Sequence, residues 1–423
     1  MRSCSIASAI LLFTLVAPVP LPAQITTGAL SLTEALAIAD RDSSLLAAQR
    51  SAISAAEETT YSARELPDPT LKFGVDSLPV TSSPGVQAYS RSQDSFTMLR
   101  VSIAQQFIRD EKRELKGRRA EYRLEREQST LASVQAGVRR DVAIPWMERY
   151  FAERMAAVVD EQYAEADLQL QTMKAGLRSN KTQPAELLML QVHLQSLLDR
   201  RAEFEKQSAR AKALLARWLP ADSNRPLAGL PERLDPGQRH DLSDHVIRHP
   251  HLQSLENQID IASSDAALAT ASRKPDWGLE VVYGRREPQF SNLLSVFVSI
   301  DLPIFQTNRQ DRSVAAKFAE VERARALKED ALRQHVAEAN AIWAEWEAAT
   351  SRIKRFDDTL LPLTRERAQL ALAAYRGGQG PLSAVLDARR VEIDLRLQQL
   401  QLAADQGRAY AQLLYFLPQE NRK

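Results

Sequence analysis

The chain has 423 residues, with 55 Lys and Arg against 54 Asp and Glu, and a formal net charge of +1. This balance argues against a nucleic-acid-binding protein, which would carry a strong basic excess. A single cysteine, Cys4, excludes a disulfide framework and a cysteine-rich metal site. The 14 Gly and 6% aromatic residues, with abundant Ala, Leu, Gln, Glu and Arg, are typical of long helices.

Residues 1–23 are predicted to form a secretory signal. Arg2 supplies a positive charge, Ile6 to Val16 form an apolar run, and Ala23 is a small residue suited to precede a cleavage site. The run of about 11 residues is shorter than the roughly 20 that a transmembrane helix needs. An N-terminal anchor helix is the alternative. We therefore expect an exported protein without a helical membrane span.

The rest of the sequence contains two similar halves. Pro184 to Pro220 aligns with Leu382 to Pro418, and further upstream Trp146 aligns with Trp343 in nearly the same register. Matches that hold register over such a distance indicate an internal duplication. We expect each half to run helix, strand, strand, very long helix, helix. The predicted boundaries are 24–220 for the first repeat, 221–240 for a linker and 241–423 for the second repeat.

Four short segments alternate apolar and polar residues, as Leu71, Phe73 and Val75 do with the residues between them. This period of two predicts strands with one apolar face. The predicted strands lie at about 69–76, 96–104, 277–284 and 293–302. Each has about 8–10 residues, close to the roughly 9–11 that a tilted strand needs to cross a membrane. A small soluble four-stranded sheet packed on helices is the alternative.

The longest predicted helix runs from Glu111 to Lys174, with only Gly117, Gly137 and Pro145 as possible breakers. At a rise of 1.5 Å per residue it would extend about 95 Å, which a compact globule of this mass cannot hold. Dense charge on the faces away from the apolar seam indicates that both sides of the helical layer meet water, as in a tube with a wet lumen.

Four strands per chain are too few to close a membrane-spanning sheet within one subunit. Backbone N–H and C=O groups cannot face lipid unpaired, so only closed barrels span a membrane. The smallest known single-chain barrels have about eight strands. Three chains would share twelve strands. The predicted fold is therefore mostly α with four β-strands in a duplicated chain, and three chains would form a 12-stranded β-barrel continuous with an α-helical tube.

Several motifs of this chain resemble the TolC-like outer-membrane efflux family. They are Ser31–Leu36, Ala63–Thr70, Asp301–Phe305 and Tyr375–Asp387, and the similarity covers 30–418. The resemblance implies a homotrimer in outer-membrane lipid, with most of the chain in the periplasm. It thus implies a trimeric 12-stranded β-barrel continuous with a periplasmic α-helical barrel. It also implies the exit duct of a tripartite pump, docked to a periplasmic adaptor protein and an inner-membrane efflux pump, with no cofactor.

Three segments, Phe73–Pro79, Phe96–Arg100 and Gln105–Phe107, are similar to the branch of the family that serves heavy-metal pumps. Heavy-metal ions are therefore the expected cargo. A duct for protein or drug export and a periplasmic coiled-coil scaffold are the alternatives. An enzyme has no support, since the sequence has no GxSxG, HExxH or Walker A motif.

The resemblance places adaptor contacts at the two helix tips. The expected contact residues are Gly176, Leu177, Gly377 and Gly378. Glycine at a helix end also suits a C-cap that needs positive φ, so these glycines have a purely structural explanation as well.

Acidic residues just past the tips are implied to line the closed periplasmic mouth. Glu186 and Asp387 match such positions, whereas Ala384 departs from the family pattern and suggests a weaker constriction. Three Asp387 carboxylates around a narrow mouth would favour cations. An ion pair of Asp387 with Arg389 or Arg390 is the alternative.

Four of the six histidines are close together in the sequence: His240, His245, His249 and His251. His245 and His249 are four residues apart, a spacing that can place two imidazoles on one metal ion. Pro250 interrupts the helical register, however. We therefore expect exposed, solvated histidines and no metal site.

Overall fold

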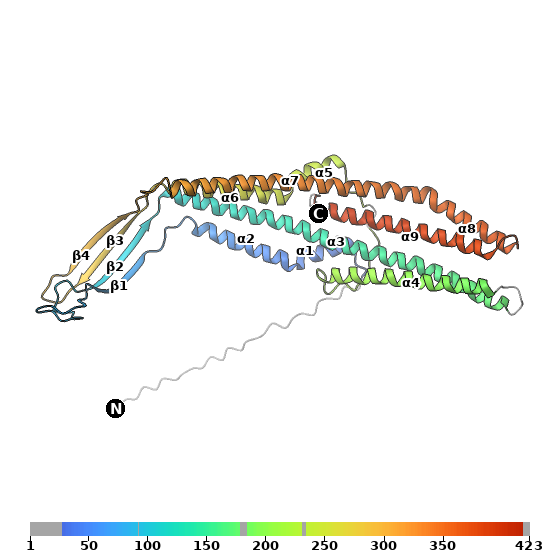
Figure 1. The fold of residues 1–423 in the computed structure, drawn as a ribbon, viewed down its shortest axis with the longest axis horizontal. Coiled ribbons are helices and arrows are strands. Elements are labelled where there is room, and N and C mark those ends of the chain that lie inside the picture. Colours follow the sequence, from blue (N-terminus) through green and yellow to red (C-terminus); the bar gives the residue numbers. More distant parts are fainter. Residues whose placement is uncertain (1–27, 92, 178–183, 231–233, 418–423) are drawn as a thin grey trace, which may run out of the picture.

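The computed structural model describes residues 28–91, 93–177, 184–230 and 234–417. The molecule is elongated, with a four-stranded sheet at one end and two helical tips at the other (Figure 1). The predicted signal at 1–23 lies outside the described residues.

The prediction of a mostly helical chain with four strands is confirmed. The first half contains α1 (Leu32–Asp42), α2 (Ser44–Ser62), β1 (Thr70–Asp76), β2 (Met98–Phe107), α3 (Asp110–Leu177) and α4 (Pro184–Ala216). The second half contains α5 (Arg239–Ile247), α6 (Pro250–Ala271), β3 (Trp277–Arg285), β4 (Leu293–Ile300), α7 (Gln310–Arg355), a π-helical turn (Phe356–Leu360), α8 (Leu361–Arg376) and α9 (Leu382–Leu413).

Helix α3 is a single helix of 68 residues, which corresponds to a length of about 100 Å. Pro145 lies inside it without ending it, although proline removes one helical hydrogen bond. The two residues that follow, Trp146 and Met147, are fully buried, and α1, α4, α6 and α9 all pack against α3. This tertiary packing offsets the local cost of the proline. In the second half, α7, the π-helical turn and α8 run end to end in the equivalent place.

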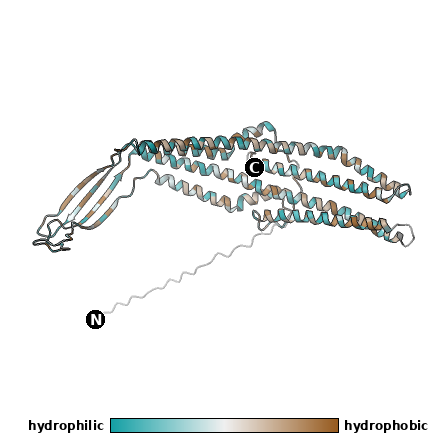
Figure 2. Cartoon of the chain, in the orientation of Figure 1, coloured by the Kyte–Doolittle hydropathy of each residue, from teal (hydrophilic) through white to brown (hydrophobic). Residues whose placement is uncertain are grey.

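The apolar core lies between the helices and is narrow. One cluster surrounds the middle of α3 and includes Leu30, Leu46, Trp146 and Leu219. A second cluster nearer the tips joins α3, α4 and α9, and includes Leu190 and Val385. In Figure 2, hydrophobic and hydrophilic residues are mixed along the long helices. Among the residues described, no helix combines the length and apolarity needed to span a membrane.

A buried arginine holds the connection after α4 against α3. The Arg149 side chain is 4% exposed, and its Nη1 and Nη2 atoms donate to the carbonyl oxygens of Ser223 and Arg225 at 2.8 and 2.9 Å. The Leu30 N–H also donates to the Pro226 carbonyl at 2.7 Å. Part of the segment predicted as a linker thus packs on the middle of the molecule.

The sheet is antiparallel throughout, in the order β1-β2-β3-β4. Strands β2 and β3 come from different halves of the chain, so their pairing joins the two halves. Strands β1 and β4 are the outer strands, and neither has a second partner strand among the described residues.

Candidate functional site

One face of the sheet is apolar and uncovered. Phe73 on β1 is 83% exposed, Val101 on β2 is 47% exposed, and Val298 on β4 is 63% exposed. Figure 2 shows the alternation of hydrophobic and hydrophilic residues along these strands. In water such a face is costly, since each buried CH₂ contributes about 0.8 kcal/mol. An apolar face of this extent therefore requires a partner surface or lipid.

The opposite face of the sheet carries a network of charges. Arg100 Nη1 lies 3.3 Å from Asp76 Oδ2, and Arg100 Nη2 lies 3.4 Å from Glu280 Oε1. The Ser102 hydroxyl donates to Glu280 Oε1 at 2.8 Å. This face also carries some apolar residues, among them Phe297, which is paired with Glu280, and Val282, which is paired with Ser102. The sheet thus has one face suited to lipid and one suited to water.

The sheet is fixed to the helices at its base. The Phe107 and Trp277 rings stack with centroids 4.3 Å apart. Lys112, one turn into α3, places its Nζ 2.8 Å from Asp276 Oδ2 and donates to the Lys274 carbonyl at 2.8 Å. Aromatic and ionic contacts together hold β2 and β3 at a fixed angle to α3.

The tip between α8 and α9 is closed by a Schellman motif. The Gly378 N–H donates to the Tyr375 carbonyl at 3.0 Å, and the Gln379 N–H donates to the Ala374 carbonyl at 2.9 Å. Gly378 has φ of 72°, as this motif requires. Gly377 has φ of −78°, so positive φ explains the glycine at 378 and not the one at 377.

The tip between α3 and α4 is described in part. Gly176 and Leu177 are the last two residues of α3. The segment 178–183 that connects them to Pro184 lies outside the described residues. The residues expected to contact the adaptor thus lie at two helix ends on the same end of the molecule (Figure 1).

Both candidate gate carboxylates lie near the helix tips. Glu186 is in the first turn of α4 and is half-buried. Asp387 is exposed and follows the buried Val385 by two residues in α9. Arg389 pairs instead with Glu165 at 3.0 Å and Glu392 at 2.8 Å, and Arg390 lies 3.9 Å from Asp394. No ion pair between described residues involves Asp387, so the alternative pairing with these arginines is not formed.

The expectation of solvated histidines is wrong for His249, which is 3% exposed. Its Nδ1 accepts from the His251 N–H at 3.2 Å and caps α6, so its Nε2 carries the proton that is donated to the Tyr415 carbonyl at 2.9 Å. Its ring also lies against the Tyr415 and Phe416 rings. His240 is exposed and His245 is half-buried.

A histidine from far along the chain completes this cluster. His335 on α7 is 7% exposed, and its Nε2 lies 2.8 Å from His251 Nδ1. Burial lowers the pKa of His249 to about 4. Burial, and then the neighbouring His251, also lower the pKa of His335. The sequence could have indicated this burial through helical spacing, because His335 lies on the buried stripe of α7 with Ala339 and Trp343.

Within the part of the chain that the structure describes, no group of three or more His, Cys, Asp or Glu side chains could hold a metal ion. Both nitrogen atoms of His249 are already hydrogen-bonded. The spacing of His245 and His249 therefore does not produce a metal site. The candidate functional features are instead the two-faced sheet and the helix tips, which lie at opposite ends of the molecule (Figure 1).

Comparison with known proteins agrees with this geometry. Residues 242–417 match the family model described as outer membrane efflux protein. The second half of the chain is therefore similar to this family. No curated protein matches the sequence.

Solved structures extend the likeness to the whole fold. The outer-membrane channel OprN has a TM-score of 0.75 and 16% identity, covering 91% of this chain and 89% of its own. CusC has a TM-score of 0.75 and 14% identity, covering 90% of both chains. The MtrE channel of Neisseria gonorrhoeae has a TM-score of 0.72 and 16% identity, covering 91% of this chain and 88% of its own. The described chain therefore has the TolC-like fold.

Outer membrane efflux proteins are transport proteins and not enzymes. The matched OprN, CmeC and MtrE structures are those of outer-membrane channels.

Proposed function

We propose that three copies of this chain form a passive outer-membrane duct that passes heavy-metal ions. The trimer is supported by the sheet, whose exposed apolar face ends at two strands that have no second partner strand in the described part of the chain. Unpaired backbone groups cannot remain in lipid. Three sheets joined edge to edge form a closed twelve-stranded barrel in which every edge is paired.

The orientation of this barrel follows from the two faces of the sheet. The face with Phe73 and Val101 would contact lipid, and the face with Arg100 and Glu280 would line the water-filled lumen. The helices then continue the lumen into the periplasm. The tips at Gly176, Leu177, Gly377 and Gly378 would meet a periplasmic adaptor protein, which connects the duct to an inner-membrane pump.

The proposed cargo rests on chemistry at the mouth and on the strand motifs. Three exposed Asp387 carboxylates around a narrow opening form a ring that favours cations, and Glu186 adds negative charge close by. The segments Phe73–Pro79 and Phe96–Arg100 are similar to the metal-pump branch of the family. Export of drugs or proteins through the same duct is the second candidate, since several different outer-membrane channels share this fold about equally closely.

Two experiments test the proposal. Membrane extracts resolved by electrophoresis without and with heating are expected to show a trimer band that heat converts to a monomer. A protein found in the soluble periplasmic fraction would instead identify a coiled-coil scaffold. Deletion of the gene is expected to sensitise cells to heavy-metal ions. Sensitivity to drugs with unchanged metal tolerance would replace the cargo proposal and leave the duct intact.

A further inference from the structure

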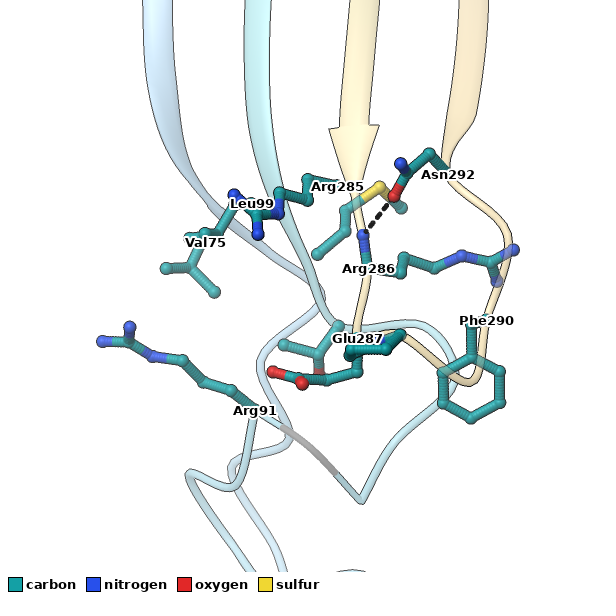
Figure 3. A pocket seen from close by; sticks show the side chains of 11 residues that line it. Val75, Arg91, Leu99, Arg285, Arg286, Glu287, Phe290 and Asn292 are labelled. Atoms are coloured by element: carbon teal, nitrogen blue, oxygen red, sulfur yellow. Dashed lines mark hydrogen bonds between the residues drawn. The ribbon is translucent and has the colours of Figure 1, made fainter.

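A cavity of about 580 Å³ lies at the end of the sheet farthest from the helices (Figure 3). It is lined by strand ends and by the two hairpin loops. The lining includes apolar side chains, among them Val75, Leu99 and Phe290, and four charged ones, Arg91, Arg285, Arg286 and Glu287. Three positive charges against one negative charge make this an anion-attracting hollow with apolar walls.

The position of the cavity on the sheet follows from the strand register. Val75 is paired with Leu99, and Leu99 is paired with Arg285, so the three side chains lie on one face of the sheet. By the same alternation this is the apolar face that carries Phe73 and Val101. Arg285 therefore ends a row of exposed apolar residues, and in Figure 3 its side chain extends across β2 toward Val75.

The arginines of the cavity differ in what they already bind. Arg286 is used by the loop itself, since its Nε donates to the Ser291 carbonyl at 2.6 Å and its Nη1 donates to the Ser95 carbonyl at 3.1 Å. Arg91 and Arg285 are both exposed. Neither forms an ion pair with any residue that the structure describes. Two guanidinium groups thus line the cavity with their charge unmatched.

We propose that this cavity binds the phosphate of a lipid headgroup in the outer leaflet, a site that rests on the proposed function. In a membrane-spanning sheet whose helices lie in the periplasm, the hairpin-loop end lies at the outer leaflet. A charged side chain at the end of an apolar strand face reaches headgroup level. Guanidinium groups bind phosphate oxygens with two parallel hydrogen bonds. The apolar wall formed by Val75 and Leu99 would contact the sugar or acyl part of the same lipid.

The ligand class is therefore a phosphorylated glycolipid such as lipid A, one per subunit. The apolar lining favours a lipid over free phosphate, because inorganic phosphate would leave Val75, Leu99 and Phe290 unused. Glu287 also lines the cavity, and its carboxylate disfavours a second anion there. The site is thus suited to a single phosphate.

The test measures lipid bound to the purified, full-length trimer by native mass spectrometry. Diphosphoryl lipid A is expected to bind in up to three copies, and lipid A from which both phosphates have been removed is expected to bind far more weakly. The double variant R91Q/R285Q is expected to lower the occupancy on the order of tenfold, as expected for loss of a charged hydrogen bond. The variant R91K/R285K keeps the positive charges but cannot form the paired hydrogen bonds of a guanidinium group. Its lipid A occupancy is expected to lie between those of the native protein and R91Q/R285Q.

The matched control is R323Q/R367Q, which removes two exposed arginines on α7 and α8 and is expected to bind lipid A as the native protein does. Equal occupancy in R91Q/R285Q and the native trimer would overturn the proposal, as would equal binding of the dephosphorylated lipid. Inorganic phosphate that raises the melting temperature of the trimer as much as lipid A does would overturn the choice of a lipid. A native protein that forms no trimer would refute the proposed function instead.

Discussion

The histidine cluster predicts that the protein loses stability between pH 7 and pH 5. His249 has an ordinary pKa of 6.5, which the fold lowers to about 4. On acidification the unfolded chain therefore takes up a proton at His249 before the folded chain does, which favours unfolding. This destabilisation is nearly absent above pH 6.5 and grows as the pH falls toward the pKa of His249 in the folded chain.

The magnitude follows from these two values. At pH 5 His249 is almost fully protonated in the unfolded chain and almost neutral in the folded one. This difference lowers the free energy of unfolding by about 2 kcal/mol per subunit, and the reduction approaches about 3 kcal/mol below pH 4. His335 shifts in the same direction, while the Glu338 carboxylate partly opposes it. Carboxylates with lowered pKa, such as Asp276, lose their contribution only at lower pH.

Heat unfolding of the purified protein, followed by circular dichroism at pH 7 and pH 5, measures this effect. H249N keeps a side-chain acceptor for the start of α6 but does not titrate, so its unfolding temperature should change less between the two pH values than that of the native protein. The control H240N removes an exposed histidine and should retain the native pH dependence. An H249N protein that is destabilised by acid as strongly as the native protein would refute the assignment of a low pKa to His249.

Three further substitutions test the gate and the packing. D387A should raise the leak conductance of the channel in planar bilayers, because it removes three carboxylates from the proposed mouth, whereas the exposed D330A should not. R149M should destabilise the protein by about 2–4 kcal/mol, because two buried loop carbonyls lose their donor, and the exposed R154M should have little effect on the heat-unfolding midpoint. G407V should lower the free energy of unfolding by about 1–3 kcal/mol, because a Cβ there would lie 3.1 Å from Phe151 Cε2 and 3.3 Å from Met147 Sδ. The control G137A places its Cβ in open space and should be neutral or stabilising in the same assay.

Each of these expectations can fail separately. Unchanged leak in D387A would remove this carboxylate from the gate without affecting the trimer. An R149M protein as stable as the native one would show that water satisfies the Ser223 and Arg225 carbonyls. A stable G407V protein would show that α3 and α9 can move apart at little cost.

Local patterns in the sequence predicted most of the fold. The period of two in the strand segments depends on neighbouring residues alone, and four strands were found. Features that depend on distant partners could not be predicted. Helix α3 continues through Pro145 because other helices pack on both sides of it, and β2 extends to Phe107, where that ring stacks on Trp277.

The same limit explains the errors at the candidate sites. His249 is buried because Tyr415 and His335, both far away in the sequence, surround it. The unmatched charges of Arg91 and Arg285 depend on how two hairpin loops meet, which no spacing in the sequence encodes. By contrast, the positive φ of Gly378 is a local requirement of the helix end, and a glycine next to the last helical residues was sufficient to predict it.

The open edges of the sheet also govern how the protein is made. In the proposed trimer, β1 of each subunit acquires its partner only from a neighbour's β4, so membrane insertion and assembly have to occur as one event among three newly exported chains. The rate of such an event falls steeply with their concentration, and a cell that halves synthesis loses more than half of its finished ducts. Until assembly is complete, the open edges of β1 and β4 would remain available for pairing with other strands, which is a route to aggregation.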